Sequence, residues 1–177
     1  WGYFTNKMQK IQATLLKNQV TSNSAEAHSL QAKSKFGEKS NQKILYSIQE
    51  AFFLNETQKM SIQDHRGKTL TKQELLKKFC NINKNFETKY AVFKDLRKKG
   101  YIVKTALKFG AEFRVYGIPK NSHSKWICFT TSENSKTSWQ DFVAKNRVAH
   151  SSKKNLLIAI VDEEASVSYF EVKWTRP

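Results

Sequence analysis

A tyrosine and a histidine stand seven positions apart in the segment YGIPKNSHSKWICF, residues 116–129. Tyr116 ends the strand-like run EFRVY, and His123 begins a second such run, HSKWICF. Gly117 and Pro119 lie between them and predict a turn, so we expect both side chains on one edge of a sheet. Each residue also has an ordinary structural interpretation, because tyrosines pack at strand ends and loop histidines bind backbone.

Two adjacent lysines, Lys153 and Lys154, precede the apolar segment NLLIAIVD. If that segment is a strand of the same sheet, it brings an ammonium group to the same edge. A base, an acid and a fixed cation would then meet, which suits RNA cleavage by the RNA's own 2′-hydroxyl without a metal or other cofactor. A tyrosine ordinarily titrates near pH ~10, so it needs neighbouring cations to serve as the base. A lysine at a strand entrance can equally just reach water.

A second group of residues suggests different chemistry. Asp162, followed by Glu171 and Lys173, resembles the acidic residue plus Glu-x-Lys of metal-dependent nucleases. Two carboxylates on neighbouring strands could hold Mg²⁺. On an alternating strand, however, a Glu-x-Lys pair also describes the solvent face. His150, near the end of an expected helix, is expected to have a structural or helix-terminus role.

Composition indicates a basic globular protein. The 177 residues carry a formal charge of +16, with 13 Lys/Arg against 6 Asp/Glu in residues 1–83 and 18 against 9 in residues 84–177. This spread favours a polyanionic partner, most simply nucleic acid, although a lysine-rich solvated surface is the alternative. No apolar run reaches the ~18 residues of a membrane span, and the lone Cys80 and Cys128 fit no zinc pattern. We therefore expect a cytoplasmic protein.

The pattern of elements predicts an α+β fold in two domains, residues 1–83 and 84–177. In the first we expect helices over 24–37, 41–56 and 71–83, and a short strand over 60–64. Ser24 or Ser22 caps the first helix, Gly37 ends it, and Thr71 with Glu74 forms a capping box. In the second we expect a helix over 86–100, strands over 101–104, 112–116 and 125–131, a helix from Ser138, and strands over 155–162 and 166–174. That order predicts a mixed sheet flanked by helices.

Several blocks of the sequence are similar to the archaeal tRNA-intron endonucleases, the tRNA splicing endonuclease family. They are KYAVFKDLRKKGYIVKTALKFGAEFRVY, HSKWICF, NRVAHSSKKNLLIAIVDEEASVSYFEVKW and, in the first half, KILYSIQEAFFL. The resemblance covers nearly the whole chain and implies a C-terminal nuclease-like domain behind a small N-terminal domain. It also implies cleavage of precursor tRNA at the bulge-helix-bulge of intron boundaries, by metal-independent 2′-hydroxyl attack that leaves a 2′,3′-cyclic phosphate and a 5′-hydroxyl.

The resemblance assigns roles to individual residues. It implies a catalytic triad of Tyr116, His123 and Lys154, with Lys153 as the alternative lysine, and a Tyr-to-His loop shorter than is usual. Arg147 matches the family's arginine that clamps a flipped-out bulge base. Trp174 is expected to be the second jaw of this clamp, with Arg176 as its alternative, and sheet packing is the other interpretation of Trp174.

The resemblance also implies an assembly of four units, in which an acidic loop docks into a basic pocket of a neighbour. Asp162, Glu163 and Glu164 occupy the place of that loop, and an ordinary acidic turn is the alternative. We therefore expect a homo-oligomer, or a heterotetramer with a homologous structural subunit. A non-catalytic, RNA-binding subunit is the alternative function, but a structural subunit has no need of all three triad residues.

Overall fold

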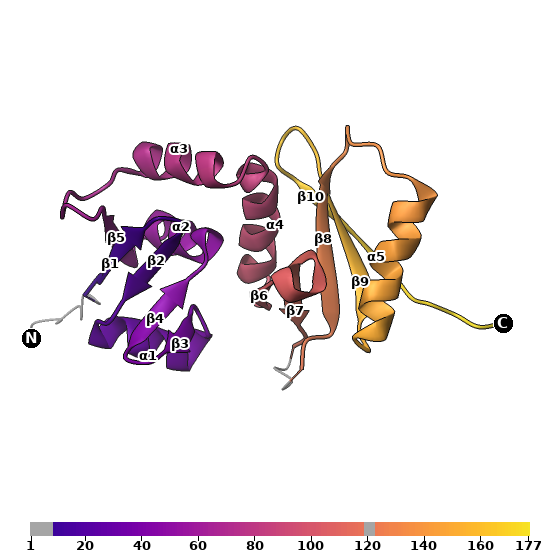
Figure 1. The fold of residues 1–177 in the computed structure, drawn as a ribbon, viewed down its shortest axis with the longest axis horizontal. Helices are drawn as coiled ribbons and strands as arrows, with labels where there is room; N and C mark the ends of the chain where they lie inside the picture. The colour runs from indigo at the N-terminus through magenta and orange to yellow at the C-terminus, as the bar shows by residue number, and fades with distance from the viewer. Residues whose placement is uncertain (1–8, 119–122) are drawn as a thin grey trace, which may run out of the picture. The chain divides into compact units, whose positions relative to one another are not determined.

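A computed structural model describes residues 9–118 and 123–177 of the chain. The chain forms two compact units, Trp1–Lys84 and Asn85–Pro177, each containing helices and a five-stranded sheet (Figure 1). The predicted α+β fold class is therefore confirmed. The turn predicted around Pro119 lies outside the described residues. Within residues 9–118 and 123–177, none of the helices has the length and apolar character needed to cross a membrane.

The N-terminal unit contains a mixed sheet with the strand order β3-β4-β2-β1-β5. Its elements are β1 (Ile11–Leu16), β2 (Gln19–Ser22), α1 (Ala25–Ser34), β3 (Glu38–Ser40), β4 (Lys43–Tyr46), α2 (Ile48–Glu56), β5 (Met60–Gln63) and α3 (Lys72–Ile82). The predicted short strand is β5, and Ser24 caps α1 as expected, through a hydrogen bond that its side chain accepts from the Ala27 backbone N–H.

Two of the predicted helices have different bounds. The prediction of a helix over 41–56 is wrong for its first half, because Lys43–Tyr46 is strand β4, which pairs with both β2 and β3. The helix begins only after Ser47, which forms a capping box with Glu50. The helix predicted to end at Gly37 ends at Ser34, where Lys35 takes the left-handed backbone conformation. Gly37 follows at φ +74°, and a Cβ there would collide with Ile44 Cγ2.

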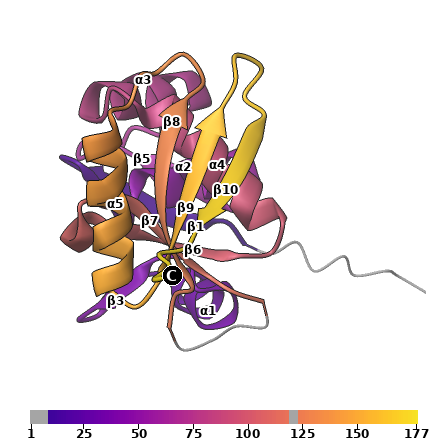
Figure 2. The ribbon, with the colours of Figure 1, turned by 90° about the vertical axis from the view of Figure 1, so that its right-hand side faces the viewer.

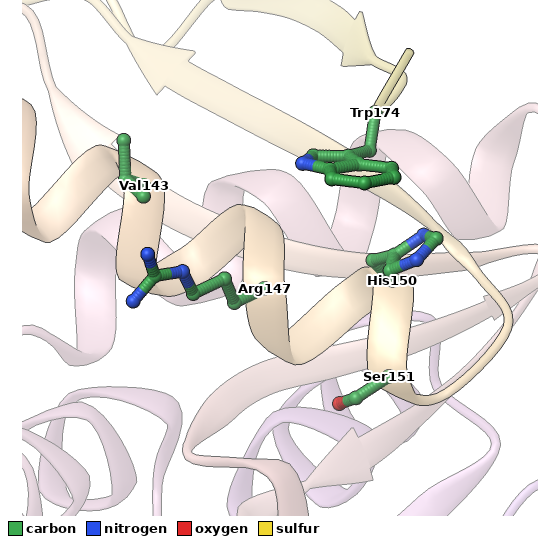
Figure 3. Close-up of a pocket in the computed structure, with 5 residues that line it drawn as sticks. All are labelled: Val143, Arg147, His150, Ser151 and Trp174. Atoms are coloured by element: carbon green, nitrogen blue, oxygen red, sulfur yellow. The ribbon is translucent and has the colours of Figure 1, made fainter. Parts of the chain in front are cut away.

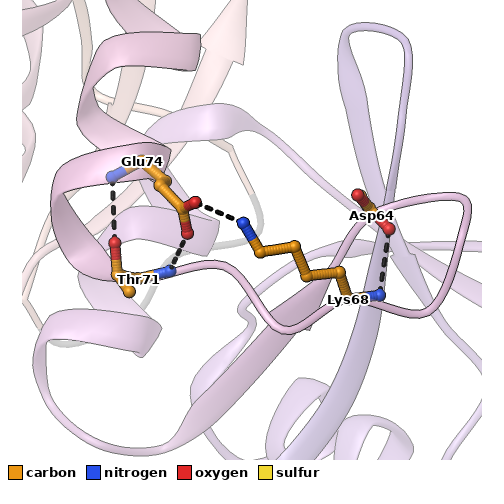
Figure 4. A network of polar contacts seen from close by, with 4 residues as sticks. All are labelled: Asp64, Lys68, Thr71 and Glu74. Atoms are coloured by element: carbon orange, nitrogen blue, oxygen red, sulfur yellow. Dashed lines mark hydrogen bonds and ion pairs between the residues drawn. The ribbon is translucent and has the colours of Figure 1, made fainter.

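A polar network joins the turn after β5 to the start of α3 (Figure 4). The Asp64 carboxylate accepts hydrogen bonds from the backbone N–H groups of Arg66 and Lys68, and the Lys68 ammonium lies 2.6 Å from the Glu74 carboxylate. Glu74 also forms the predicted capping box with Thr71. The hydrogen bond from Lys68, followed by that from the Thr71 backbone, lowers the pKa of Glu74 to about 2.

The C-terminal unit contains the sheet that positions the candidate site. Its elements are α4 (Phe86–Lys98), β6 (Ile102–Ala106), the short 3₁₀ turn η1 (Leu107–Phe109), β7 (Ala111–Tyr116), β8 (Trp126–Ser132), α5 (Trp139–Ser151), β9 (Asn155–Val161) and β10 (Val167–Val172). The strand order is β10-β9-β8-β7-β6, with β8 and β9 parallel and all other neighbours antiparallel. The predicted mixed sheet is confirmed, and α5 begins after Ser138 as expected.

Helices α4 and α5 cover opposite faces of this sheet (Figure 2). On one face, Phe113 of β7 packs against Phe93 of α4, with ring centroids 5.9 Å apart. On the other face, Ile127 of β8 belongs to a buried cluster with Ala149 of α5. Since Cys128 is the cross-strand partner of Phe113, and Ile127 precedes Cys128, the alternation of side chains places the two helices on different sides.

Candidate active site

The end of β7 and the beginnings of β8 and β9 meet at one end of the C-terminal sheet. Val115 pairs with Trp126, and Trp126 pairs with Asn155. Backbone hydrogen bonds continue this alignment through Lys125, whose N–H donates to Val115 O at 2.9 Å and whose carbonyl accepts from Asn155 N at 3.1 Å. Tyr116, the last residue of β7, and Lys154, the residue before β9, therefore both lie at this end, which we call the catalytic end after the triad that the sequence predicts.

Tyr116 and Lys154 also belong to the same face of the sheet. Arg114 pairs with Ile127 and Ile127 pairs with Leu156, so these three residues share the face that α5 covers. Tyr116 is two residues after Arg114, and Lys154 is two residues before Leu156. Because side chains alternate along a strand, both point to the α5 face. Only β8 separates them, so their backbones lie roughly 9–10 Å apart, which is two strand spacings.

The end of α5 sets the position of Lys154. Lys153 takes the left-handed conformation at φ 56°, with its N–H bonded to His150 O, while Lys154 N–H bonds to Ala149 O, each at 2.9 Å. These two bonds form a Schellman motif, which ends the helix and turns the chain into β9. The Lys154 ammonium donates to Ser152 O at 3.0 Å and lies 5.7 Å from the centre of the Phe109 ring. Lys153 is exposed, so the geometry favours Lys154 over Lys153 as the lysine that faces Tyr116.

His123 is exposed and lies two residues before Lys125, so its backbone belongs to the catalytic end. Tyr116 is half-buried, and the next residue but one after it, Ile118, is exposed. Ser124 is buried between His123 and the start of β8. The three triad residues predicted from the sequence thus enter from neighbouring strand ends.

A surface pocket of about 360 Å³ lies between α5 and the chain that follows β10, and it is lined by Val143, Arg147, His150, Ser151 and Trp174. Both predicted jaws of the base clamp, Arg147 and Trp174, therefore line the same pocket. Figure 3 shows the Trp174 indole over the His150 ring, while Arg147 extends along α5 toward Val143. Val172, two residues before Trp174, pairs with Leu156 near the start of β9, so the pocket lies toward the catalytic end.

The pocket contains a residue that the sequence interpretation missed. His150 lies in the last turn of α5, as expected, and its ring also lies 4.6 Å from that of Trp174, with an angle of 34° between their planes, so it is part of this aromatic cluster. Arg176 also lies against the indole, at 5.0 Å from its centre. The helical spacing of Val143, Arg147 and His150 was the available signal, because residues four and three positions apart share a helix face.

The acidic turn between β9 and β10 lies at the other end of the sheet. Asp162 shapes this turn, since its carboxylate accepts a 2.8 Å hydrogen bond from Ser166 N and its backbone N–H donates to Ser166 O. Glu163 contacts the loop after β8 through its backbone N–H, which donates to the Glu133 carboxylate, and through its own carboxylate, which accepts from Asn134. Its side chain and that of Glu164 lie on the exposed part of the turn.

Asp162 and Glu171 do not form the metal site that their order suggested. Glu171 pairs with Leu157, five residues before Asp162 along β9, so the two residues lie roughly 16 Å apart at ~3.3 Å per strand residue. No ion can be bound by both at that distance. Among residues 9–118 and 123–177, no group of three His, Cys, Asp or Glu side chains is arranged to hold a metal ion.

Glu171 instead joins three strands at the catalytic end. Its Oε1 accepts hydrogen bonds from Asn155 Nδ2 at 2.6 Å and from Trp126 Nε1 at 3.1 Å. Partial burial raises the pKa of the Glu171 carboxyl, but these two hydrogen bonds and the nearby Lys173 and Lys125 outweigh it and leave the pKa below its ordinary value. The carboxylate is therefore ionised at neutral pH.

Comparison with known proteins agrees with the two-unit architecture. Residues 86–169 match the tRNA intron endonuclease catalytic C-terminal domain, and residues 11–76 match the tRNA intron endonuclease N-terminal domain. The chain is 43% identical over 141 residues to a tRNA-splicing endonuclease of Thermococcus gammatolerans, covering 80% of this chain and 83% of that protein.

Two further archaeal proteins are similar to this chain at lower identity. A tRNA-splicing endonuclease of Nanoarchaeum equitans is 39% identical over 72% of this chain and 87% of its own length. One of Methanothermobacter thermautotrophicus is 36% identical over 85% of this chain and 89% of its own length. Both family domains are matched in this chain, the similarity covers most of its length and of each relative's, and the chain belongs to the tRNA intron endonuclease family.

Proposed function

We propose that the chain cleaves precursor tRNA at intron boundaries, within a bulge-helix-bulge, by metal-independent attack of the RNA's own 2′-hydroxyl. The observation that carries the proposal is the placement of Tyr116 and Lys154 on one face and at one end of the sheet, with His123 entering from the neighbouring strand. The family supports the substrate, since the similar archaeal proteins are named tRNA-splicing endonucleases.

In the proposed reaction Tyr116 is the base and His123 the acid. The Tyr116 phenolate removes the 2′-hydroxyl proton, and the 2′-oxygen forms a bond to phosphorus. The bond from phosphorus to the 5′-oxygen breaks, and protonated His123 gives its proton to that oxygen. The products are a 2′,3′-cyclic phosphate and a 5′-hydroxyl, and no external water or oxidant is consumed.

The proposed role of Lys154 is electrostatic. The five-coordinate phosphate carries an additional negative charge, which a fixed cation stabilises without any rearrangement. The Ser152 carbonyl and the Phe109 ring hold the ammonium, and the spacing of about two strands leaves room for a phosphate between Lys154 and Tyr116. A cation on the same face of the sheet would also favour the phenolate form of Tyr116 over the phenol.

Recognition of the bulge is proposed for the pocket between α5 and Trp174. A flipped-out base would stack on the Arg147 guanidinium and the Trp174 indole, both of which are flat and accept any base. The exposed acids of the β9–β10 turn, Glu163 and Glu164, are proposed to dock into a basic pocket of another subunit. This docking would give a homo-oligomer or a heterotetramer that works in the cytoplasm.

The test is cleavage of a bulge-helix-bulge RNA in excess EDTA, with mapping of the product ends. We expect 2′,3′-cyclic phosphate and 5′-hydroxyl ends, and a loss of at least about 100-fold in rate for Tyr116→Phe, His123→Ala and Lys154→Ala. Lys153→Ala is the matched control, because it removes the same charge one position earlier, and it should cleave at nearly the wild-type rate. Activity that EDTA abolishes and Mg²⁺ restores, or products with 5′-phosphate ends, would show the proposed mechanism to be wrong.

A further inference from the structure

The start of β9 is held from two sides, and only one of them faces the proposed chemistry. On the α5 face, Lys154 contacts the Ser152 carbonyl and the Phe109 ring. The next residue, Asn155, points to the opposite face, where its side-chain amide donates a 2.6 Å hydrogen bond to Glu171 Oε1. The start of β9, next to Lys154, is therefore also anchored on its other face, by the hydrogen bond from Asn155 to Glu171.

The same carboxylate oxygen also holds the start of β8. Trp126 Nε1 donates to Glu171 Oε1 at 3.1 Å, and Trp126 lies three residues after His123. The Trp126 ring is fixed further by the Lys125 ammonium, 4.2 Å from its centre, and by an edge-on contact with Tyr101 at 5.8 Å. One atom of β10, Glu171 Oε1, thus connects the start of β8, which follows His123, to the start of β9, which follows Lys154.

Glu171 is on the wrong face to take part in the reaction directly. It pairs with Leu157, which pairs with Cys128, the partner of Phe113 on the α4 face. Tyr116 and Lys154 face the other way, toward α5. We propose that Glu171 is a positioning residue, which fixes Lys154 through Asn155 and the start of β8 through Trp126. This inference rests on the proposed function, because it assumes that Lys154 acts on the phosphate.

Replacement of Glu171 by Ala should therefore slow the reaction and leave RNA binding intact. Since a misplacement of about 1 Å can cost ~10²-fold in rate, and the other contacts of Lys154 remain, we expect a fall of roughly 10-fold in kcat with KM unchanged. Glu171→Gln should restore most of the rate, because its amide oxygen can still accept both hydrogen bonds. Glu87→Ala, on the exposed first turn of α4, is the matched control for the lost negative charge and should be unaffected.

A double-mutant cycle tests the route through Asn155. If Glu171 acts through this residue, Asn155→Ala should cause a similar loss, and the double variant should be little slower than either single variant. Thermal unfolding should change little in Glu171→Ala and Glu171→Gln, because the Glu171 side chain is exposed. Wild-type kcat in Glu171→Ala, fully additive losses in the double variant, or a rise in KM that explains the whole loss would each overturn the inference.

Lys154→Ala, measured in the same assay, separates this inference from the proposed function. If Lys154→Ala is inactive while Glu171→Ala is normal, only the positioning role is wrong. If Lys154→Ala cleaves at the wild-type rate, the proposed function itself fails, and any effect of Glu171 must have another origin.

Discussion

Replacing Arg147 by Ala should weaken binding of bulged RNA with little effect on folding. Arg147 is exposed on α5 and lines the pocket beside Trp174, so its guanidinium is available to a base. Alanine is the best helix former, so the substitution should not destabilise α5. Stacking of one base on a flat side chain contributes roughly 1–3 kcal/mol, which corresponds to a loss of about 5- to 150-fold in affinity.

The assay is fluorescence polarisation with a bulge-helix-bulge RNA that carries a 2′-deoxy sugar at the cut site and so cannot be cleaved. Lys136→Ala, in the exposed loop before α5, is the matched control for the lost positive charge. Lys136→Ala should lower the affinity for the RNA only a few-fold, and this loss of affinity should become smaller as salt is added.

An RNA with an abasic site in the bulge supplies the second arm of this test. The wild type should bind this RNA as weakly as Arg147→Ala binds the intact one. Combining the abasic RNA with Arg147→Ala should lower the affinity little more than either change alone. If Arg147→Ala binds the intact RNA normally, or loses the same affinity for a plain duplex, then Arg147 does not hold a flipped-out base.

Three other properties follow from particular contacts. Glu163→Lys combined with Glu164→Lys should lower the mass of the assembly in light scattering and abolish cleavage, since both acids are exposed on a strongly basic chain. An active variant of unchanged mass would mean that the two acids belong to an ordinary turn with no role in assembly. Tyr46→Phe should be neutral or stabilising by up to ~1–3 kcal/mol in urea unfolding, because the buried hydroxyl has no hydrogen-bond partner in the described part of the chain. Clear destabilisation would show that the Tyr46 hydroxyl does have a hydrogen-bond partner. Folding lowers the pKa of Glu74 from 4.5 to about 2, so the stabilisation that its ionised carboxylate contributes is present above pH ~4.5 and is lost as the pH falls through about 2. The difference in unfolding free energy between wild type and Glu74→Gln should therefore shrink over that range. A constant difference would contradict this.

The sequence predicts the C-terminal unit well because its elements have strong local signals. The apolar run at residues 156–161 is a buried strand, and Ser138 lies where its hydroxyl caps α5. The prediction failed for KILYSIQE, because Ile44, Leu45 and Ile48 have helical spacing even though residues 43–46 form a strand. Ser47 and Glu50 form a capping box there, which was the signal that the helix starts at residue 48. Strands β1 and β2 were not predicted at all.

The candidate site could be predicted only as a set of residues. That Tyr116 and Lys154 share a face follows from the register of three strands, and register depends on pairings between residues up to 29 positions apart. For the same reason, the sequence could not show that Asp162 and Glu171 lie at different ends of the β9–β10 hairpin. The contact between the His150 and Trp174 rings also joins distant segments, although the helix face that His150 shares with Arg147 was a signal for it.

The most direct test of the central claim is the cleavage of a bulge-helix-bulge RNA with a single 2′-deoxy sugar at the cut site. If the RNA supplies its own nucleophile, and Tyr116 only removes its proton, this substrate should bind normally and should not be cut by the wild-type protein under any metal condition. A matched RNA with 2′-deoxy one nucleotide away should be cleaved at the ordinary rate. Cleavage at the deoxy site would mean that water is the nucleophile, and the roles assigned to Tyr116, His123 and Lys154 would then be wrong.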